Sequence, residues 1–474
     1  MRDLLLFAII LALIPFILKR PWLGVLAWFW IGLMVPQSHT WGFMQTFPLA
    51  VIIGLTTMGT MLFNKDRQSM PMTREMVMMF VFLAYMAMTS AFAVNRSGAW
   101  DQWNMVMKIF LMTFVTPMLI FGPRRIVWLL LVATVSIGFY GFKGGIFTIA
   151  TGGGHSVLGP DRSFLSGNTY VGLAMIMILP LLLATARMFR HRWFDLGWPM
   201  RPTWYLPVSY GFYAAFWLTG LAIIATYSRG AWLGLIVVAP FIFLRLKRKW
   251  LIVTLAVLGI GVVGVAAPDR MVDRWSTIGS YEEDTSAMQR IQAWGVNWNM
   301  AMERPITGMG FRSASLGYQW WVSYANFEGH WRHALSPHSI YFQVLGQHGF
   351  GGLAVFLTLI GFTFLTLGRI RRSARKVDQM WLSEYAWALQ IGIIGFLVAG
   401  AFLDVAYFNL LYAFVALAII MRRELDETAK RAREEKIAML EAGGRPSVDA
   451  PVPVAVAAKR PTGVVGRPGQ PGHA

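Results

Sequence analysis

His338 stands where a histidine could act as a base: it follows Ser336 and Pro337 and precedes a long apolar run. Serine is a favoured N-cap and proline a favoured first helical residue, so the sequence predicts a helix whose first turn contains His338. The positive end of a helix dipole disfavours an imidazolium, so we expect a neutral ring that can accept a proton. The alternative is an interfacial histidine that only satisfies a hydrogen bond.

Arginines beside apolar runs are the second chemical signal. Arg229 lies in a Ser-Arg-Gly turn between two apolar runs, and a guanidinium at a membrane edge is costly without a partner such as phosphate. Arg290 shares one face of a predicted amphipathic helix, 286–302, with Trp294 and Trp298. The alternatives are an arginine that anchors a helix end at the interface for Arg229 and a solvated surface arginine for Arg290.

Three further residues are candidates for the same site. Arg162 could bind an anion or pair with its neighbour Asp161, and Arg312 follows a Gly-Met-Gly turn. Asp404 is the only acid between residues 384 and 424. It would serve either a structural pairing or the orientation of a catalytic group.

The elements that position these residues are predicted to be membrane helices. Of the 474 residues, 56% are hydrophobic and 14% charged, which is too little charge for a soluble domain. Apolar runs long enough to cross about 30 Å of hydrocarbon recur along the chain. We therefore predict an all-α polytopic membrane domain, 1–423, with about 12 helices, followed by a charged helix and a disordered cytoplasmic tail over 424–474. Residues 1–36 form either two short spans or one broken span.

The predicted spans are separated by short polar connections. They lie near 4–18, 21–36, 45–63, 74–93, 102–121, 125–143, 168–186, 205–226, 231–246, 249–266, 339–366, 383–403 and 405–421.

Basic clusters alternate along the chain and predict its orientation. By the positive-inside rule their side is the cytoplasm, which also explains the net charge of +19 without a nucleic-acid partner. The other side then receives all the candidate residues above and a large loop, 267–337. We expect a bacterial inner-membrane protein, surrounded by lipid, with its site facing the periplasm. The clusters are Lys65/Arg67, Arg124/Arg125, Arg187/Arg190/Arg192, Arg245/Lys247/Arg248/Lys249, Arg369/Arg371/Arg372/Arg375/Lys376 and Arg422/Arg423.

Several chemistries are disfavoured. The chain has no cysteine, which excludes disulfides, thiol catalysis and Cys-ligated metals. No acidic cluster at ligand spacing falls on the predicted outer side, and no nucleotide-binding fingerprint occurs, so neither a metal nor a cofactor is expected. A transporter or flippase would need ionisable residues within spans, and Lys108 and Lys143 are the only mid-span bases. This alternative is less favoured.

The convergence of these residues on one predicted face suggests glycosyl transfer from a polyprenyl-diphosphate donor. Guanidinium groups suit a diphosphate leaving group, and an imidazole can deprotonate an acceptor hydroxyl.

The chain resembles the bacterial O-antigen ligase and polymerase superfamily between about 168 and 367. The family pattern has an acid at the position of Gln347. If that acid orients the histidine in the family, another group must orient it in this chain. The stretches 1–50 and 337–349 look most like the ligase subgroup, which includes exosortase-associated ligases. The matching motifs are Thr226–Trp232, the series Arg290, Trp294, Pro305 and Gly308–Gly310, and Pro337-His338-Ser339.

The resemblance implies a GT-C-like membrane glycosyltransferase. It would transfer an O-antigen glycan from undecaprenyl diphosphate to a lipid A–core sugar, with inversion and without a metal. His338 would be the base, and Arg229 and Arg290 would hold the diphosphate. An O-antigen or exopolysaccharide polymerase and a protein O-oligosaccharyltransferase share these features and remain alternatives.

Overall fold

The computed structural model describes residues 1–194, 201–246, 285–326 and 333–441, with a few isolated residues between 249 and 261. Within these residues the regular structure is helical, with no β-strand and one isolated bridge between Gly159 and Gly167. The predicted all-α class is therefore confirmed. The predicted span 249–266, much of the loop 267–337 and the tail beyond 441 lie outside the described residues.

Each predicted span within the described residues corresponds to a helix. The first two are separate helices, so residues 1–36 form two elements rather than one broken span. The helices that correspond to the predicted spans are α1 (Arg2–Lys19), α2 (Trp22–Met34), α3 (Leu49–Phe63), α4 (Arg74–Ala91), α5 (Arg96–Leu119), α6 (Gly122–Ala150), α7 (Asn168–His191), α8 (Tyr205–Ile224), α9 (Arg229–Arg245), α14 (Ile340–Lys376), α15 (Met380–Gly400) and α16 (Asn409–Glu441).

Six helices in the described part of the chain are long and apolar enough to cross a membrane by themselves: α4, α6, α7, α8 with its leading turn, α14 and α15. The chain is thus a multi-pass helical membrane protein. The total of about 12 spans and the GT-C-like arrangement stay predictions. Of the six, α7 and α15 are the most buried and contact each other along their lengths, so they form the centre of the bundle.

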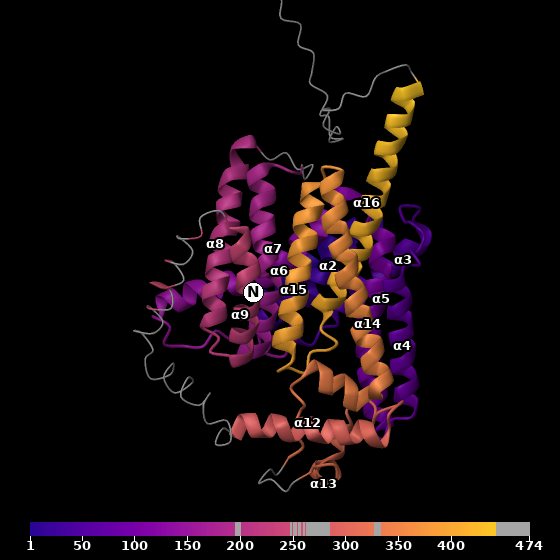
Figure 1. Cartoon of the computed structure of the whole chain (residues 1–474), viewed down its shortest axis with the longest axis vertical. Coiled ribbons are helices and arrows are strands. Elements are labelled where there is room, and N and C mark those ends of the chain that lie inside the picture. The colour runs from indigo at the N-terminus through magenta and orange to yellow at the C-terminus, as the bar shows by residue number, and fades with distance from the viewer. Residues whose placement is uncertain are drawn as a thin grey trace, which may run out of the picture.

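One end of the bundle is covered by extramembrane structure. The predicted amphipathic helix 286–302 is confirmed as α12 (Thr285–Glu303), which lies across this end nearly at right angles to the bundle (Figure 1). The short helix α13 (Tyr318–Val322) lies beyond it, whereas α16 projects from the opposite end. The membrane sides of these ends stay predictions. The 3-10 turns are η1 (Pro36–His39), η2 (Phe43–Gln45), η3 (Pro202–Trp204) and η4 (Ser313–Leu316).

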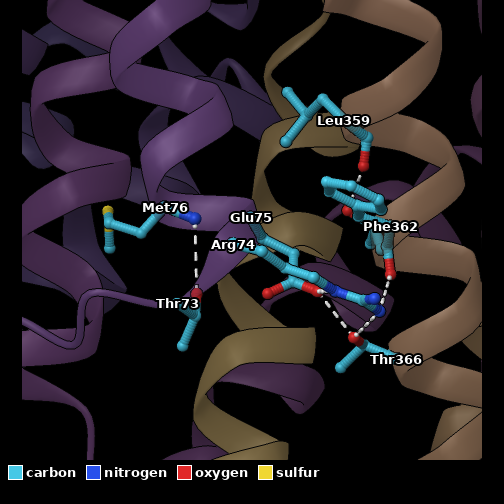
Figure 2. A network of polar contacts seen from close by, with 8 residues as sticks. Thr73, Arg74, Glu75, Met76, Leu359, Phe362 and Thr366 are labelled. Atoms are coloured by element: carbon cyan, nitrogen blue, oxygen red, sulfur yellow. Dashed lines mark hydrogen bonds and ion pairs between the residues drawn. The ribbon is translucent and has the colours of Figure 1, made fainter.

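Buried polar clamps join the helices near the α16 end. Glu75 at the start of α4 is 3% exposed; it accepts hydrogen bonds from the Thr366 hydroxyl at 2.5 Å and from Arg74 Nε at 3.0 Å (Figure 2). Arg74 also donates to the Phe362 carbonyl at 3.2 Å. A buried carboxylate needs such partners, so this network fixes α4 against α14.

A second clamp joins three helices. Glu384 on α15 accepts hydrogen bonds from Arg187 on α7, at 3.1 Å, and from Arg245 at the end of α9. One buried carboxylate thus holds together the cation-rich ends of α7 and α9.

Helix α14 is broken by the segment 305–310, which packs into it. Gly349 has a φ of 67°, and the Phe350 N–H donates to the Pro305 carbonyl at 2.8 Å instead of to its own helix. The N–H groups of Met309 and Gly310 donate to carbonyls of residues 346 and 347 at 2.9 Å. The loop after α12 is therefore anchored to α14 by backbone hydrogen bonds.

Gly349→Ala is expected to destabilise the protein by about 1–3 kcal/mol. A Cβ there would lie 2.3 Å from the Pro305 carbonyl oxygen, in a backbone conformation that disfavours side chains. The midpoint of thermal unfolding in detergent measures the loss. Gly361→Ala on the same helix is the control, since its Cβ would have no neighbour within 4 Å; equal losses in both variants would contradict the prediction.

Candidate active site

His338 precedes α14 and is not in its first turn. The helix begins at Ile340 with Ser339 as N-cap, and His338 adopts a left-handed conformation with a φ of 41°. The prediction that Ser336 and Pro337 begin the helix is wrong. The expectation of a ring kept neutral by the helix dipole depended on that placement and loses its basis with it.

The reason is that both residues are engaged by other elements. The Ser336 hydroxyl donates to Asp404 Oδ2 at 2.6 Å, which directs this side chain toward the connection after α15, and it caps no N–H group of α14. The Pro337 carbonyl accepts a hydrogen bond from the Trp294 indole of α12 at 2.8 Å. These two contacts hold the segment before α14 away from the helix axis, and the chain turns at His338.

Asp404 is the centre of the polar group at this end of the bundle. It lies in the connection 401–408 between α15 and α16, and its Oδ1 is 3.6 Å from Nδ1 of His338. The same oxygen accepts a hydrogen bond from the Tyr170 hydroxyl of α7 at 2.6 Å. The His338 and Asp404 side chains are 44% and 26% exposed. Three distant parts of the chain thus meet here, and the His338–Asp404 pair remains partly exposed.

The surroundings of Asp404 keep it ionised. Burial alone would raise the pKa of its carboxyl, but the imidazole of His338 and the hydroxyls of Ser336 and Tyr170 lower that pKa well below its ordinary value. A carboxylate beside Nδ1 orients the ring and stabilises the charge that the ring gains when Nε2 takes a proton. At 3.6 Å the two atoms are within ion-pair distance and just beyond a hydrogen bond, so the arrangement is that of a histidine beside a carboxylate, the pairing that general bases use.

The carboxylate that the structure places beside His338 therefore belongs to a different element from Gln347. Gln347 itself accepts a hydrogen bond from the Tyr407 hydroxyl at 2.8 Å. Tyr407 follows Asp404 by three residues.

A second histidine helps to fix the connection that carries Asp404. His348 is fully buried; its Nδ1 is 2.7 Å from the Thr89 hydroxyl and its Nε2 is 2.8 Å from the Tyr407 hydroxyl. Gln343 also accepts the Ala406 N–H at 3.0 Å. These contacts attach 401–408 to α14. Sequence reasoning missed Tyr170, His348 and Tyr407, because only their three-dimensional neighbours distinguish them from other interfacial aromatic and polar residues.

Arg229 opens α9 directly beside this connection. Ser228 caps the helix by accepting the Ala231 N–H at 3.4 Å. Gly230 packs so closely on the connection that a Cβ would lie 3.3 Å from Cβ of Phe402. The half-buried Arg229 is therefore positioned by a turn that touches the residue two places before Asp404.

Arg290 is carried by α12, which packs near the same region. It is half-buried and lies one helical turn before Trp294. The Trp294 ring stacks on Phe342 of α14 with centroids 5.3 Å apart, and its centroid is 6.5 Å from that of Phe402. The elements that carry Arg229 and Arg290 thus both pack against the connection that holds Asp404.

The other two arginines have contacts elsewhere. Arg162 is exposed and donates to Gln45 at 3.1 Å, rather than forming an ion pair with Asp161, in the part of the chain that the structure describes. Arg312 donates to Gln102 of α5 at 3.1 Å. The structure does not bring these two to Asp404, and a role for them in binding stays a prediction.

The fold and the site define a helical membrane protein with a histidine–carboxylate pair and arginine-bearing elements at one end of the bundle. A family model described as O-antigen ligase matches residues 214–357, a range that contains Arg229, Arg290 and His338. This match covers less than a third of the chain and supports membership of the O-antigen ligase/polymerase superfamily. A family of unknown function, DUF5935, matches residues 1–189. No curated protein matches the chain.

Proposed function

We propose that this protein is an O-antigen ligase of the bacterial inner membrane. It transfers a glycan from undecaprenyl diphosphate to a sugar of lipid A–core on the periplasmic face. Membership of the ligase and polymerase superfamily supports a lipid-linked glycan substrate. The observation that carries the proposal is the His338–Asp404 pair, because it offers a histidine with a carboxylate beside it in a chain that has Gln347 where the family pattern has an acid.

In the proposed reaction Nε2 of His338 removes the proton from the acceptor hydroxyl. The hydroxyl oxygen attacks the anomeric carbon of the donor sugar while the bond from that carbon to the diphosphate oxygen breaks. The bonding pair leaves with undecaprenyl diphosphate, whose charge Arg229 and Arg290 stabilise. Attack opposite the leaving group inverts the anomeric centre, and no step requires a metal.

The acceptor is tested by omission. We expect the purified protein, given polyprenyl-diphosphate glycan in EDTA, to form product only when lipid A–core is added; gel mobility of the lipid A–core measures the product. Chain lengthening from the donor alone would instead identify a polymerase, and transfer to an added acceptor protein an O-oligosaccharyltransferase. A strict metal requirement would refute the mechanism.

A further inference from the structure

A cavity of about 450 Å³ lies among the N-terminal helices of the bundle, and His338 is not among its lining residues. Helices α2, α3 and α5, residues 162–164 and the start of α16 line it, and its walls are mainly apolar. Val51 and Leu55 of α3 line it and are 39% and 65% exposed. The cavity therefore opens on the apolar surface of a membrane protein, and its size falls in the range of ligand sites, about 300–1,000 Å³.

Two cations line this cavity without any carboxylate among its lining residues. Lys108 lies in the middle of α5 and Arg162 lies in the connection between α6 and α7. A charged side chain within a span is costly, and such residues usually mark a ligand path. The charge of the cavity is therefore complementary to that of an anion. Binding of an anion would also explain why a lysine, which the candidate active site does not use, lies within a span.

Two of the residues that line the cavity carry buried amide oxygens. Gln37 Oε1 and Asn409 Oδ1 are buried and lack a hydrogen-bond donor among the described residues. Asn409 is 4% exposed, and its amide nitrogen is already used, donating to the Gly32 carbonyl at 3.0 Å. A buried acceptor without a donor costs roughly 1–3 kcal/mol, so rotation of the two amide groups toward a ligand with hydroxyl groups would satisfy both oxygens.

We propose that this cavity binds one anionic phospholipid whose head group carries free hydroxyls, the chemistry of phosphatidylglycerol. An acyl chain lies against the apolar walls, the phosphate interacts with Lys108 and Arg162, and the hydroxyls donate to Gln37 and Asn409. The proposal does not depend on the transferase function, since lipid retention can be measured without turnover.

The test uses the full-length protein in nanodiscs of phosphatidylcholine that contain a minor fraction of one anionic lipid. Native mass spectrometry counts the lipids that stay bound to the protein after it is released from the nanodisc. We expect phosphatidylglycerol to be retained over both phosphatidylcholine and phosphatidic acid, which lacks head-group hydroxyls. Lys108→Gln should lower its retention by about fivefold, and Gln37→Met should abolish the preference over phosphatidic acid.

Lys143→Gln is the matched control, because Lys143 is an exposed cation of α6 outside the cavity lining. An equal loss in this variant would overturn the site, as would displacement of the lipid by excess inorganic phosphate. Stronger retention of polyprenyl phosphate or lipid A than of phosphatidylglycerol would overturn the assigned occupant. Equal retention of phosphatidic acid by the wild type would overturn the role of the amide oxygens.

Discussion

Replacing His338 with alanine is expected to slow glycan transfer by about 10²- to 10⁴-fold, the usual contribution of a general base. The alanine cannot take the proton of the acceptor hydroxyl, while the elements that carry Arg229 and Arg290 stay in place. Initial rates of lipid A–core modification, measured with polyprenyl-diphosphate glycan in EDTA, give the loss.

The control for this variant is His155→Ala. His155 is an exposed histidine in the connection between α6 and α7, so its removal should leave the rate unchanged. Undiminished product from His338→Ala would refute the assignment of the base.

The Asp404→Asn variant should lose about 10²-fold or more in rate, because the amide cannot stabilise the imidazolium that forms during the reaction. A structural role alone would not alter the pH dependence of the rate. We expect the pH dependence of the rate to change in the variant, since the protonated ring loses its anionic partner. Asp161→Asn, which changes an exposed acid near Arg162, should leave the profile as it is.

The stability of the protein should also depend on Asp404 in a defined pH range. Its pKa in the folded protein is lowered from the ordinary value of 3.8, so its contribution to stability is complete above that value and disappears as the pH falls through the lowered pKa. The unfolding midpoints of wild type and Asp404→Asn should therefore differ most near neutral pH and approach each other in strong acid. A constant difference at all pH values would contradict this linkage.

Most of the fold could be predicted because each helix is a local property of the sequence. Apolar length identified the spans in the described residues, and the spacing of Arg290, Trp294 and Trp298 identified α12. The broken helix α14 could not be predicted in the same way. Gly349 departs from helical geometry because residues 305–310 supply alternative hydrogen-bond partners, and that pairing is a long-range contact.

The candidate site was predictable in its residue types but not in its pairings. The Ser-Pro-His sequence is a good helix-start signal, and it failed because Ser336 contacts Asp404, which lies 68 residues away in the chain. Asp404 also falls outside the range that the ligase family model matches. Its isolation among apolar residues marked it as unusual, whereas its closeness to His338 required the packing of α7, α14 and the α15–α16 connection.

Helix α16 starts five residues after Asp404 and continues without a glycine or proline to Glu441, emerging at the far end of the bundle. At 1.5 Å per residue it is a rod about 50 Å long. A tilt of the protruding charged end of α16 would therefore also displace its start, which only four residues separate from Asp404.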